Sequence, residues 1–188
     1  MFFNPSLRTR NSFEAGIFQL GGHGHFLQPE ATRLPTLEGE DVPYASERIS
    51  DVARVLSRMG DAIAIRCYGD PVKWEYGGAH RMLREFARWA DIPVLNMEDD
   101  IFHPFQGLAD IFTVKEKFGG FKGVKFLMSW AYSPSIEKPR AVPQSAILYA
   151  CARVLVAAMM TSRRARRSIG PLCVGIGTRK CASSRAAC

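Results

Sequence analysis

Short apolar segments alternate with amphipathic segments along the first 150 residues of the chain. Apolar residues recur three and four positions apart in three stretches, which predicts helices after Ser46, up to Ala90 and from Pro104 onward. Alternating strands and helices are typical of a parallel sheet covered on both faces. The pattern therefore predicts an α/β fold with three layers, α/β/α, around a central parallel sheet. The predicted strands are residues 1–3, 25–27, 62–66, 94–96 and 124–129.

The chain length fits one such domain, because 188 residues are too few for two complete α/β domains. Residues 1–3, Met-Phe-Phe, have the composition of a core strand and follow no helix or turn. A further helix is predicted from Val142 to about Val156, after a proline-rich loop. We therefore expect residues 1–150 to form one domain that lacks its first helix and is truncated at both ends.

Basic residues are concentrated near the C-terminus. The net charge is +7, yet residues 1–150 have a net charge of −1, whereas residues 151–188 contain 8 basic and no acidic residues. This segment also contains four of the five cysteines and no aromatic residue, a composition unlike that of folded domains. We expect residues 151–188 to be a non-native tail, such as a frameshifted one, or a disordered tail. The alternative is a nucleic-acid-binding arm, which is disfavoured because residues 1–150 contain no basic stripe with aromatic platforms.

Several other classes of protein and site are disfavoured. The sequence has no run of about 18 apolar residues that could span a membrane, and no signal peptide, so we expect a cytoplasmic protein that does not bind membranes. No cysteine or histidine spacing indicates a metal site, and no cofactor is expected. The acidic residues Glu98, Asp99 and Asp100 are expected to form a solvated turn. Cys67 is expected to be a plain buried thiol.

The strongest chemical motif is the 4–9 turn, Asn-Pro-Ser-Leu-Arg-Thr, where the first predicted strand gives way to a helix. A helix N-terminus presents free N–H groups and partial positive charge to an anion. Ser6, Arg8 and Thr9 can add side-chain donors to phosphate oxygens. A phosphate site is one interpretation. An ordinary helix cap with solvent-exposed arginines accounts for the motif equally well.

Two further segments favour the ligand site. Arg66 ends the apolar segment AIAIR, and open α/β sheets bind ligands at the carboxyl ends of their strands. An arginine buried there needs an anionic partner. In HPFQGLAD, His103 and Gln106 lie about one helical turn apart, so both can face one small ligand.

These three motifs, FFNPSLRTRNSFE, AIAIR and HPFQGLAD, occur in the order and spacing of the aspartate and ornithine carbamoyltransferase family. Residues 1–150 resemble its carbamoyl-phosphate-binding domain. The proline-rich SWAYSPSIEKPRAVPQS is similar to that of the knotted branch, which includes N-acetylornithine and N-succinylornithine carbamoyltransferases. The resemblance implies a homotrimeric transferase of arginine biosynthesis. It would move the carbamoyl group of carbamoyl phosphate to the amine of an ornithine-type amino acid, with or without N-acylation.

The resemblance also implies roles for single residues. Ser6, the Leu7 backbone, Arg8 and Thr9 would hold the phosphate. Thr9, Arg66 and His103 would polarise the carbamoyl oxygen, and Gln106 would accept a hydrogen bond from the carbamoyl NH2. A loop of a neighbouring subunit, with Arg33 as a candidate, would complete the site.

The sequence departs from the family pattern in two ways. Phe105 and Gly107 differ from the residues the family often has, a change expected to affect packing only. The second domain of the family, which binds the amino acid, has no counterpart in the chain. The alternative to a working enzyme is therefore a catalytically inactive remnant that at most binds carbamoyl phosphate or phosphate.

Overall fold

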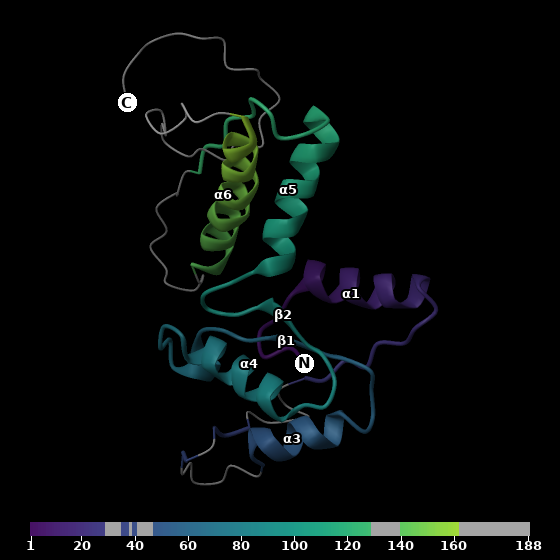
Figure 1. Ribbon diagram of the computed structural model, residues 1–188. Coiled ribbons are helices and arrows are strands. Elements are labelled where there is room, and N and C mark those ends of the chain that lie inside the picture. The colour runs from purple at the N-terminus through teal and green to yellow at the C-terminus, as the bar shows by residue number, and fades with distance from the viewer. Residues whose placement is uncertain (29–34, 38, 41–46, 129–139, 162–188) are drawn as a thin grey trace.

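The computed structural model describes residues 1–28, 35–37, 39–40, 47–128 and 140–161 (Figure 1). Helices and strands alternate through this part of the chain, as the sequence predicts for an α/β fold. In chain order the elements are α1 (Leu7–Gln19), α3 (Ile49–Leu56), β1 (Ile63–Arg66), the 3-10 turn η1 (Asp70–Val72), α4 (Gly78–Trp89), β2 (Val94–Glu98), α5 (Pro104–Phe118) and α6 (Ala141–Thr161).

β1 and β2 pair in parallel and form the centre of the molecule. Residues 1–3 lie on the other edge of β1, where the Phe3 amide donates to the Arg66 carbonyl oxygen at 2.9 Å. The Leu27 carbonyl oxygen in turn accepts from the Phe2 amide at 3.0 Å. The predicted strands at residues 1–3 and 25–27 are therefore adjacent extended segments, with one isolated bridge between Phe2 and Arg66. The predicted strand at 124–129 is wrong for residues 124–128, which form no strand.

The main core lies between the sheet and the helix pair α3 and α4. Ile63 and Ile65 of β1 are buried, and they pack with residues from both helices and from residues 1–3. Figure 1 shows α3 and α4 on one side of the strands and α1 with α5 on the other, which confirms the predicted three layers. The helical residues of this core are Ile49, Ala53, Ala79, Met82, Leu83 and Phe86.

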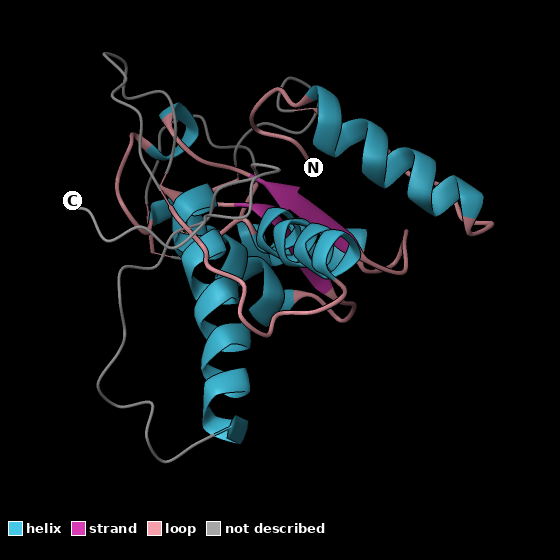
Figure 2. Ribbon diagram, turned by 90° about the horizontal axis from the view of Figure 1, so that it is seen from above, coloured by secondary structure: helices cyan, strands magenta, loops and turns pink. Residues whose placement is uncertain are grey.

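The helices on the other side of the sheet are less buried. α5 and α6 pack on each other around a small cluster of Ile111, Phe126 and Ala150. α1 contains no buried residue, and Figure 2 shows it reaching away from the strands. This side of the molecule is therefore held by few apolar contacts within the described residues.

The helix ends follow from local sequence, with two differences from prediction. Pro104 occupies the first turn of α5, as predicted, and Gly119 ends it in a left-handed conformation (φ 70°) that favours glycine. α3 begins at Ile49, later than predicted, and Ser46 lies outside the described residues. α6 continues to Thr161, past the predicted end near Val156 and past residue 150.

Within the described part of the chain, no helix combines the length and apolarity that crossing a membrane requires. The same part contains no group of three or more His, Cys, Asp or Glu side chains that could hold a metal ion.

Candidate functional site

A β-bulge sets the chemistry at the carboxyl ends of the two strands. Ile65 pairs with Asn96, but the register shifts at the next residue, so Arg66 pairs with Glu98 and not with Met97. Opposite residues in a sheet project from the same face, and a shift of one residue therefore changes the side chain that faces Arg66. The bulge replaces an apolar partner with a carboxylate, which forms a buried ion pair with the guanidinium.

His103 completes a buried group of three, which we call the strand-end cluster: Arg66, Glu98 and His103. His103 precedes α5, and its backbone amide donates to Ser145 Oγ of α6 at 2.8 Å. Its Nε2 lies 3.3 Å from Glu98 Oε2. Two strand ends and the start of α5 therefore place a guanidinium and an imidazole around one carboxylate.

Burial and the nearby Arg66 charge lower the pKa of His103 from 6.5 to about 4. The imidazole is therefore neutral at physiological pH. Since the neutral ring can donate from Nε2 to Glu98, Nδ1 is left as an acceptor, and it is buried with no hydrogen-bond partner among the described residues. A neutral imidazole with a positioned N–H can polarise an oxygen atom by donating a hydrogen bond, without transferring its proton.

Tyr68 lies beside the same arginine. Its phenol oxygen accepts from Arg66 Nη2 at 3.1 Å, and the guanidinium carbon lies 5.1 Å from the ring centroid. Burial is the largest influence on the pKa of Tyr68 and raises it. The guanidinium thus contacts Glu98 and Tyr68, while its Nε has no hydrogen-bond partner in the part of the chain that the structure describes.

The acidic run after β2 is buried, so the expectation of a solvated turn is wrong. Glu98, Asp99 and Asp100 are 4%, 0% and 7% exposed. Asp99 accepts from His80 Nδ1 at 2.7 Å, and Asp100 accepts from the Gly77 and His80 amides. Because Gly77 has no capping side chain, Asp100 serves as the cap of α4 from a distant segment.

The acidic run also affects the neighbouring thiol. Burial, followed by the Asp100 and Asp99 charges, raises the pKa of Cys67 to about 12. Cys67 is fully buried, which confirms the expectation of a buried thiol.

The 4–9 turn has the geometry of a helix cap. Ser6 precedes α1 in an extended conformation, and its Oγ accepts from the Thr9 amide at 3.3 Å. Leu7 is 80% exposed, Arg8 is also exposed, and Thr9 is half-buried. The hydroxyl proton of Ser6 and the Arg8 guanidinium therefore remain accessible to an anion at the N-terminus of α1.

A hollow of about 540 Å³ adjoins this turn. Ser6, Leu7 and Arg10 line it together with apolar residues from positions 2, 3 and 26. Arg66, His103 and Gln106 do not line it. The structure therefore brings the predicted site residues together in two groups, the 4–9 turn and the strand-end cluster.

Two predicted site residues lie apart from these groups. Gln106 is exposed, and its Nε2 donates to Asp110 within α5 at 2.8 Å. Arg33 lies outside the described residues. Gly107 is buried against Tyr149 and Ser145 of α6, which agrees with a role in packing.

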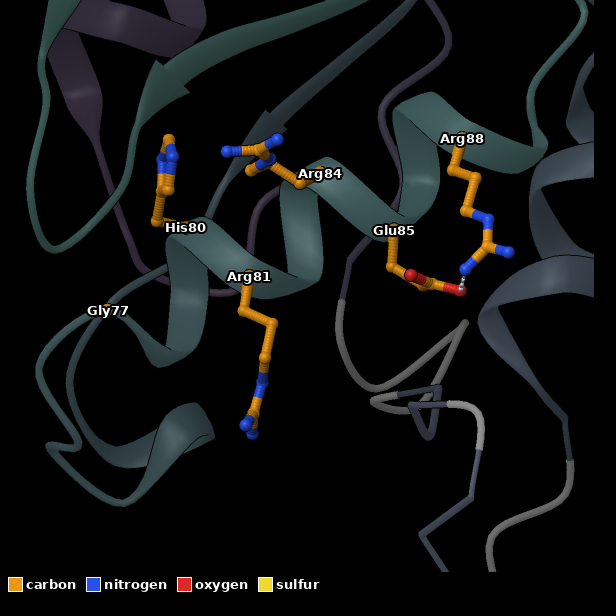
Figure 3. Close-up of a pocket in the computed structure, with 6 residues that line it drawn as sticks. All are labelled: Gly77, His80, Arg81, Arg84, Glu85 and Arg88. Carbon is orange, nitrogen blue, oxygen red and sulfur yellow. Dashed lines mark ion pairs between the residues drawn. The ribbon is translucent and has the colours of Figure 1, made fainter.

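A second hollow, of about 550 Å³, runs along α4 and is lined by His80, three arginines, Glu85 and Gly77 (Figure 3). Its charged groups diverge, because Arg81 points away from the side on which His80 and Arg84 lie. Arg81 is paired with Glu40 at 3.2 Å, and Arg88 lies 3.9 Å from Glu85. This hollow does not concentrate donors on one small ligand.

Sequence reasoning missed three residues that organise the site: Glu98, Tyr68 and Asn4. The signal for Glu98 was present, since a buried arginine and a histidine at neighbouring strand ends need a carboxylate nearby. The bulge that turns Glu98 toward Arg66 has no clear sequence signal.

Comparison with known proteins gives a consistent set of relatives. N-acetylornithine carbamoyltransferase of Xanthomonas campestris is 40% identical over 161 residues, covering 80% of this chain and 45% of the relative. Ornithine carbamoyltransferase of Methanoculleus marisnigri is 42% identical over 130 residues, covering 69% of this chain and 35% of the relative. The chain thus spans less than half the length of these curated relatives.

Solved structures give the same result. A crystal structure of acetylornithine transcarbamylase complexed with acetylcitrulline matches with a TM-score of 0.70 at 40% identity, covering 79% of this chain and 46% of that chain. The model of the aspartate/ornithine carbamoyltransferase family for its carbamoyl-phosphate-binding domain matches residues 1–116. This match includes both the 4–9 turn and the strand-end cluster, and the chain therefore belongs to the aspartate/ornithine carbamoyltransferase family.

Proposed function

We propose that the chain supplies the carbamoyl-phosphate-binding part of a carbamoyltransferase. The reaction moves the carbamoyl group of carbamoyl phosphate to the amine of an ornithine-type amino acid, and N-acetylornithine is the first acceptor to test. The observation that supports this most is that Arg66, at the carboxyl end of β1, and the neutral His103, at the start of α5, meet at Glu98, where β2 ends. The names of the relatives support the choice of acceptor.

In this proposal the 4–9 turn binds the phosphate. Ser6 and Thr9 contribute hydroxyl groups, Leu7 its backbone amide and Arg8 its guanidinium, all at the N-terminus of α1. Free N–H groups and the helix dipole favour the anion there, and the guanidinium can form two parallel hydrogen bonds with it. The phosphate then leaves with its charge already compensated.

The strand-end cluster acts on the carbamoyl group. Negative charge develops on the carbamoyl oxygen as the amine attacks, and donors already aimed at that oxygen lower the barrier. Arg66 and His103, with Thr9, are the proposed donors, and Gln106 is the proposed acceptor for the carbamoyl NH2. Because the Nε2 of His103 is directed at Glu98, the proposal requires this N–H to turn from Glu98 to the ligand. Because Gln106 is bonded to Asp110 in the ligand-free chain, the proposal requires its side chain to rotate when the ligand binds.

The arrangement of the whole protein is also part of the proposal. We expect a homotrimer that acts in arginine biosynthesis in the cytoplasm, with Arg33 of a neighbouring subunit near the site. Residues 1–150 act as the carbamoyl-phosphate-binding domain and residues 151–188 as a tail outside it. Sedimentation analysis of the purified chain tests the trimer directly.

Calorimetric titration tests the proposed ligand. The unaltered chain is expected to bind both carbamoyl phosphate and inorganic phosphate, and Arg8→Ala is expected to weaken both by about tenfold or more, because one charge-assisted contact is lost. Arg84→Ala is the matched control, since Arg84 is also an exposed helical arginine and lies on α4, away from the turn. Equal affinities in the two variants would place the phosphate elsewhere.

A binding function without transfer is the second candidate. It is favoured by Glu98, whose carboxylate already compensates Arg66 in the ligand-free chain. Incubation with carbamoyl phosphate and either ornithine or N-acetylornithine separates the two candidates. Formation of a ureido product supports the transferase, whereas saturable binding without product supports the binding function.

A further inference from the structure

Asn4 joins the two groups of site residues through both ends of its side-chain amide. Its Nδ2 donates to the Tyr68 carbonyl oxygen at 2.9 Å, and its Oδ1 accepts from the Tyr68 backbone amide at 2.8 Å. The two bonds connect positions 64 residues apart in the chain. Asparagine is suited to this contact because its amide can donate and accept at once, as a backbone peptide does.

The position of Asn4 gives this contact a consequence for the site. Asn4 lies two residues before Ser6, so it holds the start of the 4–9 turn. Tyr68 lies two residues after Arg66, and its phenol oxygen accepts from Arg66 Nη2 at 3.1 Å. One residue, Tyr68, therefore binds the turn through its backbone and the guanidinium through its side chain.

We propose that Asn4 is a positioning residue that fixes the 4–9 turn at the distance from Arg66 that carbamoyl phosphate requires. This inference rests on the proposed function, in which the turn holds the phosphate and Arg66 contacts the carbamoyl oxygen. Carbamoyl phosphate must reach both groups, whereas inorganic phosphate needs the turn alone. A shift between the two groups therefore weakens binding of the longer ligand selectively, since a misplaced donor loses its hydrogen bond.

The ratio of the two affinities is the measurement that separates positioning from general stability. Asn4→Ala removes both bonds to Tyr68. Ser57→Ala is the matched control, because Ser57 Oγ also makes two hydrogen bonds, one to the Ala53 carbonyl oxygen at 2.7 Å and one from the amide of the distant Asp91 at 3.0 Å. Asn4→Ser is a milder variant, since its shorter side chain can replace at most one of the two bonds.

Calorimetric titration of each protein with carbamoyl phosphate and with inorganic phosphate gives the expected pattern. Asn4→Ala raises the Kd for carbamoyl phosphate by about tenfold and the Kd for phosphate by less than about twofold. Asn4→Ser shifts the ratio in the same direction by a smaller factor and decides the question if Asn4→Ala does not fold. Ser57→Ala leaves the ratio unchanged.

The experiment distinguishes failure of this inference from failure of the proposed function. If the Asn4 variants weaken both ligands equally, or if Ser57→Ala shifts the ratio as much, Asn4 contributes to folding only. If the unaltered chain binds carbamoyl phosphate more tightly than phosphate and the Asn4 variants keep that ratio, this inference alone fails. If the unaltered chain binds neither ligand, the proposed function fails and this inference with it.

Discussion

The 4–9 turn and the strand-end cluster offer positive charge to a ligand in opposite ways. The turn is open, because Leu7 and Arg8 are exposed and α1 has no buried residue behind them. The cluster is closed, since Arg66, Glu98 and His103 are 7%, 4% and 8% exposed and Glu98 contacts the other two. The 4–9 turn can bind an anion with little change in the stability of the fold. The strand-end cluster, in contrast, is stable only because Glu98 compensates the buried charge of Arg66.

In the proposed function, this difference assigns phosphate binding to the turn and the carbamoyl-transfer step to the cluster of the same domain. An exposed helix N-terminus gains little stability from its donors, so it keeps them available to a ligand. A buried guanidinium must be compensated in the free chain, and its partner then competes with any ligand. Substitutions in the two regions should therefore differ in sign and size.

The largest effect is expected in the cluster, from Glu98→Gln. The substitution keeps the shape of the side chain but leaves the Arg66 charge buried without its anion. Breaking a buried pair by removing one partner typically costs about 3–5 kcal/mol of unfolding free energy. Urea unfolding measures the loss. Glu116→Gln, on the exposed side of α5, is the control and should change stability by less than about 0.5 kcal/mol.

Equal stabilities for Glu98→Gln and Glu116→Gln would contradict the comparison. Such a result would mean that the Arg66 charge is compensated by a group other than Glu98.

The second effect is a pH dependence that comes from His103. Its pKa is about 4 in the folded chain and 6.5 ordinarily, so the unfolded chain takes up the proton first as the pH falls. The contribution to stability is full above about pH 6.5 and is lost as the pH falls through 4. The loss is about 3 kcal/mol between these limits. Urea unfolding from pH 7 to pH 4 measures it.

His103→Gln isolates this contribution, because glutamine does not titrate. The stability of this variant should fall less steeply over the same pH range, while the other acidic groups act in both proteins. Parallel curves for the two proteins would show that His103 is not buried as a neutral group.

Sequence patterns predicted the elements around these regions better than the contacts inside them. The starts of α1 and α5 followed from Ser6 and Pro104, because caps and prolines act within a few residues. The family and the candidate residues came from three motifs. The extended segments at 1–3 and 25–27 were placed correctly but do not form full strands, since pairing depends on partners far away in the chain.

The contacts that organise the cluster required the structure for a physical reason. Glu98 faces Arg66 because of one β-bulge. Without this one-residue shift in register, Met97 would lie opposite Arg66. The contact between Asn4 and Tyr68 spans 64 positions and involves backbone atoms, which leave no pattern in the side-chain sequence. Asp100 likewise caps the N-terminus of α4 through the Gly77 and His80 amides, which lie 23 and 20 residues before it.

Glycine substitutions should act with opposite sign in α1, which follows the turn, and in α5, which follows His103. A Cβ on Gly107 would lie 2.6 Å from Tyr149 Cδ2 and 3.1 Å from the Ser145 carbonyl oxygen, next to the Ser145 hydroxyl that holds His103. Gly107→Ala should cost about 1–3 kcal/mol by overpacking. A Cβ on Gly16 in α1 meets nothing within 4 Å, so Gly16→Ala should stabilise by about 0.5–1 kcal/mol. Thermal unfolding measures both, and a loss of stability in Gly16→Ala would show that α1 is not open.

The smallest loss of stability is expected at the turn, from Ser6→Ala. The substitution removes the Oγ that accepts from the Thr9 amide, and loss of such a cap typically costs about 1 kcal/mol. Ser12→Ala is the control on the same helix, because the Ser12 hydroxyl donates to the Thr9 carbonyl oxygen and caps nothing. Its stability should change by less than about 0.5 kcal/mol. Ser6→Ala should also weaken phosphate binding, because the Ser6 hydroxyl is both the cap of α1 and a proposed donor to the phosphate. Unchanged phosphate affinity would mean that the hydroxyl serves the helix alone.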